Sequence, residues 1–482
     1  MKTTRIVLAL IAGVAGLNAA DSVMFSPEAA AAAANDEIAA RGPLKLTMKR
    51  AVQIATSPEG NTRVQLDLES LKQAKDRSRE VLAGLLPDVE AYVGVGSSVR
   101  SLAAGGFTDI QSPALTDAIN LINDFNKAEN KPLVTFAIPP RIGPFDTLDM
   151  RGEASMNLFD FSLIKKLKAS HATVRASQNN VNSTDETVSS QVAKAYLAAL
   201  RADADVEASQ ADVDLSQAEL KQSEHSKEAG SGTGMDVTRA NVQLANDKQL
   251  LLVAKNNQTK SHLQLLRVMN MRLDTPVELV DKLEYKPLDT LSVDDAISQA
   301  LANRPDLKAQ LQNEDAAKLN ASSVKYERMP TVVAQANYGT IGPPTVALLP
   351  TREFYGSVRI PIFDGGRRDA RRAESFSQMR QESIKTADLR DQIELDVRLA
   401  MDSLKSADEQ VKVAEDGLKL AEREMAQARR RFDAGVAGSL EVSDASDKLQ
   451  RARTNKIDAL FNHNAARIDF GQALGKTSSM ID

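Results

Sequence analysis

Apolar residues recur between positions 393 and 432 in alternating steps of four and three. The row consists of Ile393, Val397, Ala400, Leu404, Ala407, Val411, Ala414, Leu418, Ala421, Met425, Ala428 and Phe432. This spacing predicts a long helix with one apolar seam that packs against a neighbouring helix. From Ala400 onward one position of each heptad is alanine, which lets the neighbour approach closely, and a strict seven-residue repeat implies left-handed supercoiling.

The same seam occurs 205 positions earlier, where Val188 corresponds to Ile393. Its members are Val188, Val192, Ala195, Ala199, Ala202, Val206, Ser209, Val213, Ser216 and Leu220. One apolar heptad row is typical of any coiled coil or helix bundle. Two copies at a fixed offset, with matching flanks, indicate instead an internal duplication.

Each copy continues into a turn and a return helix. Long helices are predicted at about 162–227 and 367–432, each roughly 100 Å long at the rise of an α-helix. Both end in glycine-containing turns, EAGSGTGMDV and DAGVAGSLEV. Return helices are predicted at 235–269 and 440–474. They are followed by Asn270 and Gly475, residue types suited to a left-handed helix end.

Each copy begins with two shorter helices. The segments LTMKRAVQI from Leu46 and LSVDDAISQA from Leu291 predict short helices, capped by Thr47 and Ser292. The second helices are predicted at 63–86 and 305–328, the latter with Pro305 at a favourable first position. Each ends at a proline, Pro87 in the first copy and Pro330 in the second.

After these prolines the period changes from helical to alternating, which predicts two strands in each copy. The first strand of each copy begins directly after Pro87 or Pro330, with DVEAYVGVGS and TVVAQANYG. The return strands are clearer, and they are predicted at 148–158 and 354–362. Strands of about ten residues with one apolar face fit membrane-spanning strands, although a half-exposed strand of a soluble sheet alternates equally. Four strands cannot close a barrel alone, so several chains would have to share one.

The first copy is longer between its two strands. Pro330 follows Pro87 by 243 positions, whereas Phe363 follows Phe159 by 204, so the first copy carries 39 extra residues within about 97–147. They include an amphipathic piece near 115–125. We interpret the insertion as an elaborated surface loop in preference to a ligand-binding element.

Composition argues against catalysis and metal binding. The 482 residues include no Cys, no Trp, 4 His and 4% aromatic residues, so we expect no enzyme activity, no cofactor and no metal site. The net charge of -5 arises from 60 basic and 65 acidic residues that nearly cancel. Without a concentrated basic surface, nucleic-acid binding is not expected.

The N-terminus has the pattern of a secretory signal. Lys2 and Arg5 precede the apolar run Ile6–Leu17, and small residues follow. We predict a signal peptide at 1–20, because a membrane anchor would need about 20 apolar residues and this run has 12. Residues 21–45 are predicted to be a flexible N-terminus. Farther along the chain no run is apolar and long enough for a transmembrane helix.

This order of elements resembles the TolC family of outer-membrane efflux and secretion proteins. The resemblance rests on the paired openings at Leu46 and Leu291, the helix-ending prolines and the VRIPIFDGG segment at 358–366. The paired turns at 229–237 and 432–442 are the most diagnostic. It implies a mainly α fold with a small β part, in which each repeat contributes long coiled helices and two strands. Three chains would form a trimeric 12-stranded β-barrel, continued by a periplasmic α-helical tube.

The resemblance also implies a domain plan and a function. The first repeat would span 46–275 and the second 286–478. The chain would be a homotrimeric, passive exit duct in the outer membrane, with its helical tube in the periplasm. It would serve a tripartite efflux pump or a type I secretion system, and its partners would be a periplasmic adaptor protein and an inner-membrane pump. The alternative is a periplasmic or surface coiled-coil scaffold that forms no channel.

In that family the glycine-containing tips dock the adaptor, and acidic residues line a nearby constriction. The matching tip positions are Gly230, Gly234, Asp236, Gly435, Ser439 and Leu440. Glu441 and Asp444 fall at the constriction, where carboxylates would concentrate cations. Equally, the two acids could simply favour a helix N-terminus. A tyrosine and an arginine that help to close TolC correspond here to Phe432 and Ala437, so Arg430 or Arg431 would have to substitute.

Overall fold

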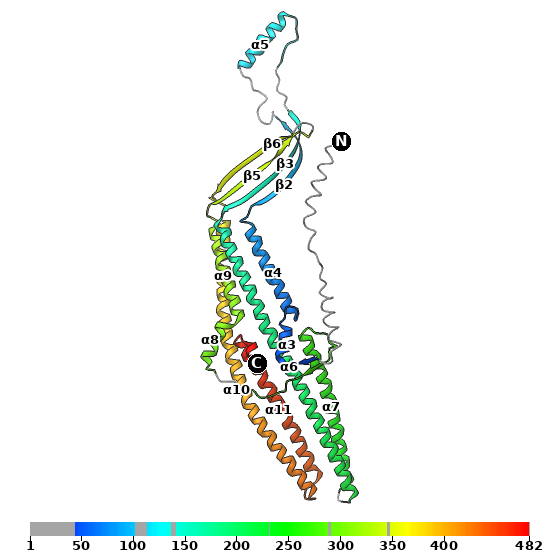
Figure 1. Cartoon of the computed structure of the whole chain (residues 1–482). Coiled ribbons are helices and arrows are strands. Elements are labelled where there is room, and N and C mark those ends of the chain that lie inside the picture. The colour runs from blue at the N-terminus through cyan, green and yellow to red at the C-terminus, as the bar shows by residue number, and fades with distance from the viewer. Residues whose placement is uncertain are drawn as a thin grey trace. The chain divides into compact units, whose positions relative to one another are not determined.

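The computed structural model describes residues 44–101, 113–135, 141–230, 232–287, 291–344 and 348–481. The chain divides into two compact units, both of which draw on both sequence repeats (Figure 1). The sheet unit comprises Glu69–Asn179 and Lys308–Asp388, and the helical unit comprises the rest. The predicted signal peptide lies outside the described residues, as does the predicted flexible N-terminus except for its last two positions.

The sheet unit contains one antiparallel sheet of four strands in the order β2-β3-β5-β6. The strands are β2 (Asp88–Ser101), β3 (Arg141–Phe159), β5 (Thr331–Gly342) and β6 (Leu349–Arg359). The predicted pair of strands in each copy is therefore confirmed, and β3 pairs with β5 to join the copies. The predicted end of β6 at Ile362 is wrong, because Pro361 cannot donate a ladder hydrogen bond. Ile362 is 95% exposed.

Strand register gives the sheet two chemically different faces. Val89 pairs with Ala154, Ala154 with Ala336 and Ala336 with Phe354, so one cross-strand row is apolar throughout. One position along, the neighbouring row has the opposite chemistry: it consists of Glu90, Glu153, Asn337 and Glu353. Since successive side chains point to opposite faces, these rows confirm the predicted alternation. Val89 and Phe354 are more than 70% exposed.

The 39-residue insertion contains a helix, α5 (Pro113–Ala128), which agrees with the amphipathic piece predicted from sequence. Asn123 fastens the returning chain to this helix. Its side-chain amide donates to the carbonyl of Val134 at 2.8 Å, and its carbonyl accepts from the Val134 amide at 2.6 Å. The remaining helices of the sheet unit belong to longer elements, among them α4 (Thr62–Ala83) and α9 (Pro305–Tyr326), each within a few residues of its predicted bounds.

Four long helices follow the predicted plan closely. The long helices are α6 (Phe161–Glu228) and α10 (Arg367–Asp433), and the return helices are α7 (Gly234–Val268) and α11 (Ser439–Ala473). Both return helices have 35 residues and stand 205 positions apart, which confirms the duplication. None of the helices in the described part of the chain has the length and apolarity needed to cross a membrane.

The short helices are also present, with the predicted caps. They are α3 (Met48–Ala55) and α8 (Val293–Asn303). The Thr47 side chain accepts from the Arg50 amide at 3.3 Å, and that of Ser292 from the Asp295 amide at 3.2 Å. Three further elements were not predicted: β1 (Leu44–Leu46), β4 (Val277–Leu279), which pairs with it in parallel, and α12 (Thr477–Ile481). Elements of three to five residues are too short to produce a sequence period.

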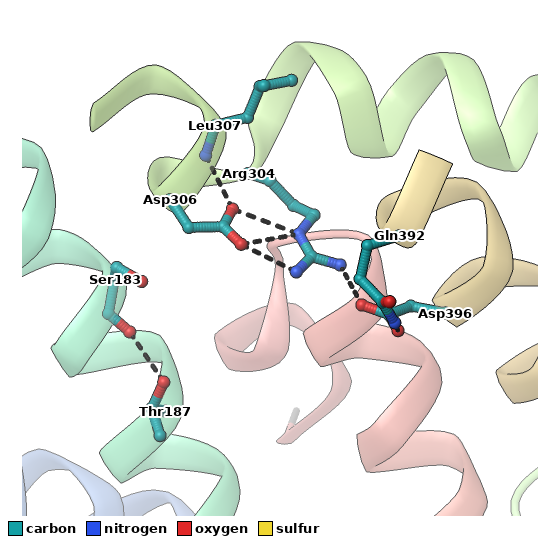
Figure 2. Close-up of polar contacts among 7 residues, drawn as sticks. All are labelled: Ser183, Thr187, Arg304, Asp306, Leu307, Gln392 and Asp396. Carbon is teal, nitrogen blue, oxygen red and sulfur yellow. Dashed lines mark hydrogen bonds and ion pairs between the residues drawn. The ribbon is translucent and has the colours of Figure 1, made fainter. Parts of the chain in front are cut away.

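Polar contacts fix the start of α9 (Figure 2). Arg304 donates to Asp306 at 2.7 Å and to Asp396 of α10 at 2.9 Å, while Asp306 also accepts from the Leu307 amide at 2.8 Å. The backbone of Arg304 lies against Gly475, where an added Cβ would stand 2.9 Å from the Arg304 Cα. Gly475 has φ +68°, so its position requires glycine both for the left-handed backbone and for space.

The heptad seam of α10 is buried within its own chain. Ile393 and Val397 are fully buried with Phe470 and Leu474, and Val411 packs with Leu460 of α11. Farther along, Ala421, Met425 and Ala428 pack against Val442, Ala445 and Leu449. The seam therefore holds a long helix against its own return helix, as the alanine row predicts.

We predict that enlarging this alanine row destabilises the helical unit. In the double variant Ala407→Leu and Ala414→Leu, several methylenes are forced into a packed seam, at a cost of about 1 to 3 kcal/mol per site. Thermal unfolding should shift to lower temperature. Ala426→Leu, on the exposed side of the same helix, is the matched control and should change little. An unchanged melting temperature in the double variant would show that the seam is not a packed contact.

Candidate functional site: the paired helical tips

The two tips are the turns between each long helix and its return helix. In the first tip Gly230 has φ +73°, and in the second Gly435 has φ +68°. Both glycines therefore supply the left-handed backbone that ends a helix. Gly234 is the first residue of α7, and Leu440 lies in the first turn of α11 with 66% of its surface exposed.

The two return helices begin differently. Thr233 caps α7 and forms a capping box with Asp236, whose carboxylate accepts from the Thr233 amide at 3.0 Å. The cap of α11 is Gly438, which has no side chain to accept a hydrogen bond. Ser439, the first residue of α11, has a partner outside its own hairpin.

That partner is Asp236 of the other tip. The Ser439 hydroxyl donates to the Asp236 carboxylate, and Arg239 donates to the Ser439 oxygen at 2.8 Å. Arg239 also lies 3.6 Å from Asp236. These hydrogen bonds, first that from Ser439 and then those from Thr233, lower the pKa of Asp236. The structure thus joins two of the predicted tip residues into one ionised link between the repeats, to which Arg239 adds a residue that sequence analysis missed.

The two predicted constriction residues are paired on the surface of the second hairpin. Glu441 lies 3.0 Å from Arg431, and Asp444 lies 2.9 Å from Lys448. Arg431, one of the two predicted substitutes for the closing arginine, therefore contacts its own hairpin. Since both pairs are about half exposed, their contribution to stability is small.

A cavity of about 270 Å³ lies between the hairpins, and the linked residues Asp236, Arg239 and Ser439 form part of its wall. Its wall includes Glu219 of α6 and Arg429 of α10, whose charged atoms are 3.9 Å apart. The Glu219 side chain is only 16% exposed, and burial raises its pKa to about 7. The nearby carboxylates of Asp247 and Asp447 act in the same direction. Neither Glu219 nor Arg429 belongs to the seam, so the apolar pattern gave no signal for them.

A series of polar contacts joins the hairpins beside the cavity and farther from the tips. Arg453 donates to Asp212 at 2.5 Å, Arg201 lies 2.6 Å from Asp458, and Gln243 donates to Asp447 at 3.4 Å. Asp247 is 3% exposed, and burial raises its pKa. In the part of the chain that the structure describes, no group of His, Cys, Asp or Glu side chains is arranged to hold a metal ion.

Residues 146–271 and 296–476 match the model of the outer membrane efflux protein family, and the chain belongs to that family. Membership identifies an outer-membrane protein of a transport family whose long helices lie in the periplasm, and it confirms the resemblance found in the sequence.

Individual relatives have low sequence identity to this chain. The toluene efflux pump outer membrane protein TtgF of Pseudomonas putida is 25% identical over 293 residues, which are 59% of this chain and 60% of TtgF. The outer membrane protein TolC of Vibrio cholerae is 22% identical over 333 residues, 67% of this chain and 76% of TolC. The chain thus spans less than two thirds of the length of TtgF.

Among solved structures, the fold is similar to that of the outer membrane protein VceC of Vibrio cholerae. The TM-score is 0.71 at 17% identity, and the match covers 89% of this chain and 96% of VceC. This likeness confirms the predicted TolC-like fold.

We predict that Glu219 makes the stability of the helical unit depend on pH. Because its pKa is raised in the folded state, the folded protein holds a proton that the unfolded chain releases above about pH 4.5. Stability therefore falls as pH rises from there through 7, by at most about 3 kcal/mol. Glu219→Gln should remove this part of the decline, so the variant should gain stability over the native protein at pH 8 but not at pH 4.5.

The measurement is the melting temperature from pH 4.5 to 8, with Glu224→Gln on the exposed side of α6 as the control. The control should follow the native profile. Parallel profiles for Glu219→Gln and the native protein would mean that Glu219 is ionised normally.

Proposed function

We propose that this protein is a passive outer-membrane channel, the exit duct of a tripartite efflux pump or a type I secretion system. The observation that carries the proposal is the two-faced sheet. Its apolar row is more than 70% exposed at Val89 and at Phe354 and suits lipid, while the row with Glu90, Glu153 and Glu353 suits a water-filled interior. A soluble scaffold would gain nothing from an exposed apolar face of this extent.

The working form is proposed to be a homotrimer. Four strands from each of three chains would supply twelve, joined at the edge strands β2 and β6. The helices support the same assembly, because α10 has a second apolar row on the side opposite its seam. That row consists of Leu395, Leu399, Val413 and Leu420, each at least 49% exposed. Leu399, Val413 and Leu420 are spaced by multiples of seven, so they form a stripe suited to a helix of a neighbouring chain.

We predict that charges in this second row prevent assembly without unfolding the chain. Val413→Glu with Leu420→Glu places carboxylates where apolar contact is expected, whereas Gln410→Glu, on an exposed polar position of the same helix, is the control. Mass measured by light scattering should be trimeric for the native protein and the control, and monomeric for the double variant, with helical circular dichroism retained. A trimeric double variant would exclude this row from the interface.

We further propose that the tips dock a periplasmic adaptor protein, which connects the channel to an inner-membrane pump. Three apolar side chains support this proposal because they stand exposed at the tips. Met235, Val436 and Leu440 are 66 to 71% exposed. They flank the turns at Gly230 and Gly435, and exposed apolar groups of this kind are typical of protein contacts. No catalytic step is part of the proposed function.

Glu441 and Asp444 are proposed to line the constriction. The pairing with Arg431 and Lys448 reduces the net negative charge there, so the native cation preference should be modest. Replacing both acids by lysine changes the local charge by twelve units in a trimer, two units at each of two sites in three chains. The channel should then prefer anions, most clearly at low salt where screening is weak.

Reversal potentials in a salt gradient across a planar bilayer measure this preference. The matched control is Asp402→Lys with Glu409→Lys, two exposed carboxylates far from the tip on α10. Its reversal potential should remain close to the native value. If the Glu441 and Asp444 variant is trimeric and its reversal potential is also native, the two acids serve only the start of α11.

A further inference from the structure

A second cavity, of about 670 Å³, lies in the helical unit where α3 begins, beside the segment after β4 and the ends of α11 and α12. Its wall has a cationic part and an apolar part. The cationic side chains are Lys49, Lys282, Lys286 and Arg467. The apolar side chains are Met48, Leu197, Leu200, Val280, Ile468, Met480 and Ile481. The volume is within the range of small-molecule sites, about 300 to 1,000 Å³.

Arg467 is the most unusual residue of this wall. Its Nε atom is buried and has no hydrogen-bond partner within the described residues. Burial lowers the pKa of its guanidinium, and no neighbouring carboxylate offsets the effect. By contrast, buried Arg304 in the same unit is paired with two aspartates. A partly desolvated guanidinium whose buried Nε lacks a hydrogen-bond partner is costly, so the position favours a bound anion.

The wall carries four basic side chains and two acidic ones, Asp281 and Glu284. Asp281 already has two hydrogen-bond donors, because one of its oxygens accepts from the Met48 amide at 2.8 Å and from the Tyr196 hydroxyl at 2.9 Å. The start of α3 adds the positive end of a helix dipole on the same side.

From this combination we propose that the cavity binds an amphiphilic organic anion. Arg467 and Lys282 would hold a carboxylate or phosphate group, for which the planar guanidinium is suited. The apolar part of the ligand would lie against Leu197, Leu200 and Ile468. A fatty acid and a phospholipid headgroup share this chemistry. The site lies outside the tips and is independent of the proposed channel function.

Ligand binding at this position has a structural consequence. The wall is made from α3, the segment after β4, α6, α11 and α12, which come from both repeats. An anion that contacts them together binds the folded helical unit and not the unfolded chain. It should therefore raise the melting temperature of the protein.

The test is isothermal titration of the purified full-length protein in a neutral detergent, with octanoate as the probe. Octanoate should bind and raise the melting temperature, whereas octylammonium, of the same length and opposite charge, should not bind. Arg467→Gln should weaken octanoate binding roughly tenfold or more, as expected for losing a charge-assisted hydrogen bond. Arg451→Gln, at an exposed position of the same helix, is the matched control and should bind like the native protein.

Further measurements identify the type of ligand and cover the case of a variant that does not fold. Lys282→Gln should also weaken binding, which covers the case in which Arg467→Gln does not fold. Competition between inorganic phosphate and octanoate would indicate that the ligand is a phospholipid headgroup. If phosphate does not compete, the ligand is of the fatty-acid type. Equal binding of octanoate and octylammonium, or native affinity in the folded Arg467 and Lys282 variants, would overturn the proposal.

Discussion

The seam between each long helix and its own return helix is the contact on which the rest of this structure depends. A helix of 67 residues exposes a great deal of apolar surface unless something covers it along its whole length. In the second repeat, α11 covers the lower part of the seam from Val411 to Phe432, and the C-terminal end of α11 with α8 covers the upper part. Each hairpin consequently has its own apolar core. The recurring alanine brings the paired helices close together and fixes their register.

Toward the tips most contacts between the hairpins are polar, although Ile468 of α11 is buried in the apolar cluster of the first repeat and Leu215 of α6 packs against that of the second. Arg453 with Asp212 and Arg201 with Asp458 are ion pairs at a partly buried surface, where the cost of desolvation offsets most of the attraction. Asp247 and Glu219 add carboxyl groups whose pKa values burial raises, so ionising them opposes the contact. Such an interface specifies alignment but contributes little net cohesion.

Sequence periodicity predicted the helices, the strands and the duplication because each depends on a pattern repeated over many residues. It missed the starts of both return strands, because β3 begins at Arg141 and β6 at Leu349, before the predicted 148 and 354. Its other errors lie where one residue or a very short segment decides. The end of β6 was placed three residues too far because Pro361 interrupts an otherwise regular alternation. At the tips, glycine patterns located Gly230 and Gly435, but nothing in the spacing connects Asp236 and Arg239 with Ser439, which lies about 200 positions farther along. The cavity lined by Arg467 was invisible for the same reason, since its wall comes from five separate elements.

The link at the tips shows how a duplicated chain can acquire an asymmetric contact. Both repeats need a cap at the start of the return helix, and the first satisfies this need with Thr233 and Asp236. The second has Gly438, which offers no side-chain cap. Replacing a capping side chain by alanine typically costs about 1 kcal/mol of stability, but replacing it by glycine costs only a few tenths. The next residue, Ser439, donates its hydroxyl to one oxygen of Asp236, whose other oxygen accepts from the Thr233 amide in the capping box of α7. One carboxylate therefore helps to cap the start of a helix and connects two hairpins, so separating the tips must break the hydrogen bonds of Ser439 with Asp236 and Arg239 but leaves the cap of α7 intact.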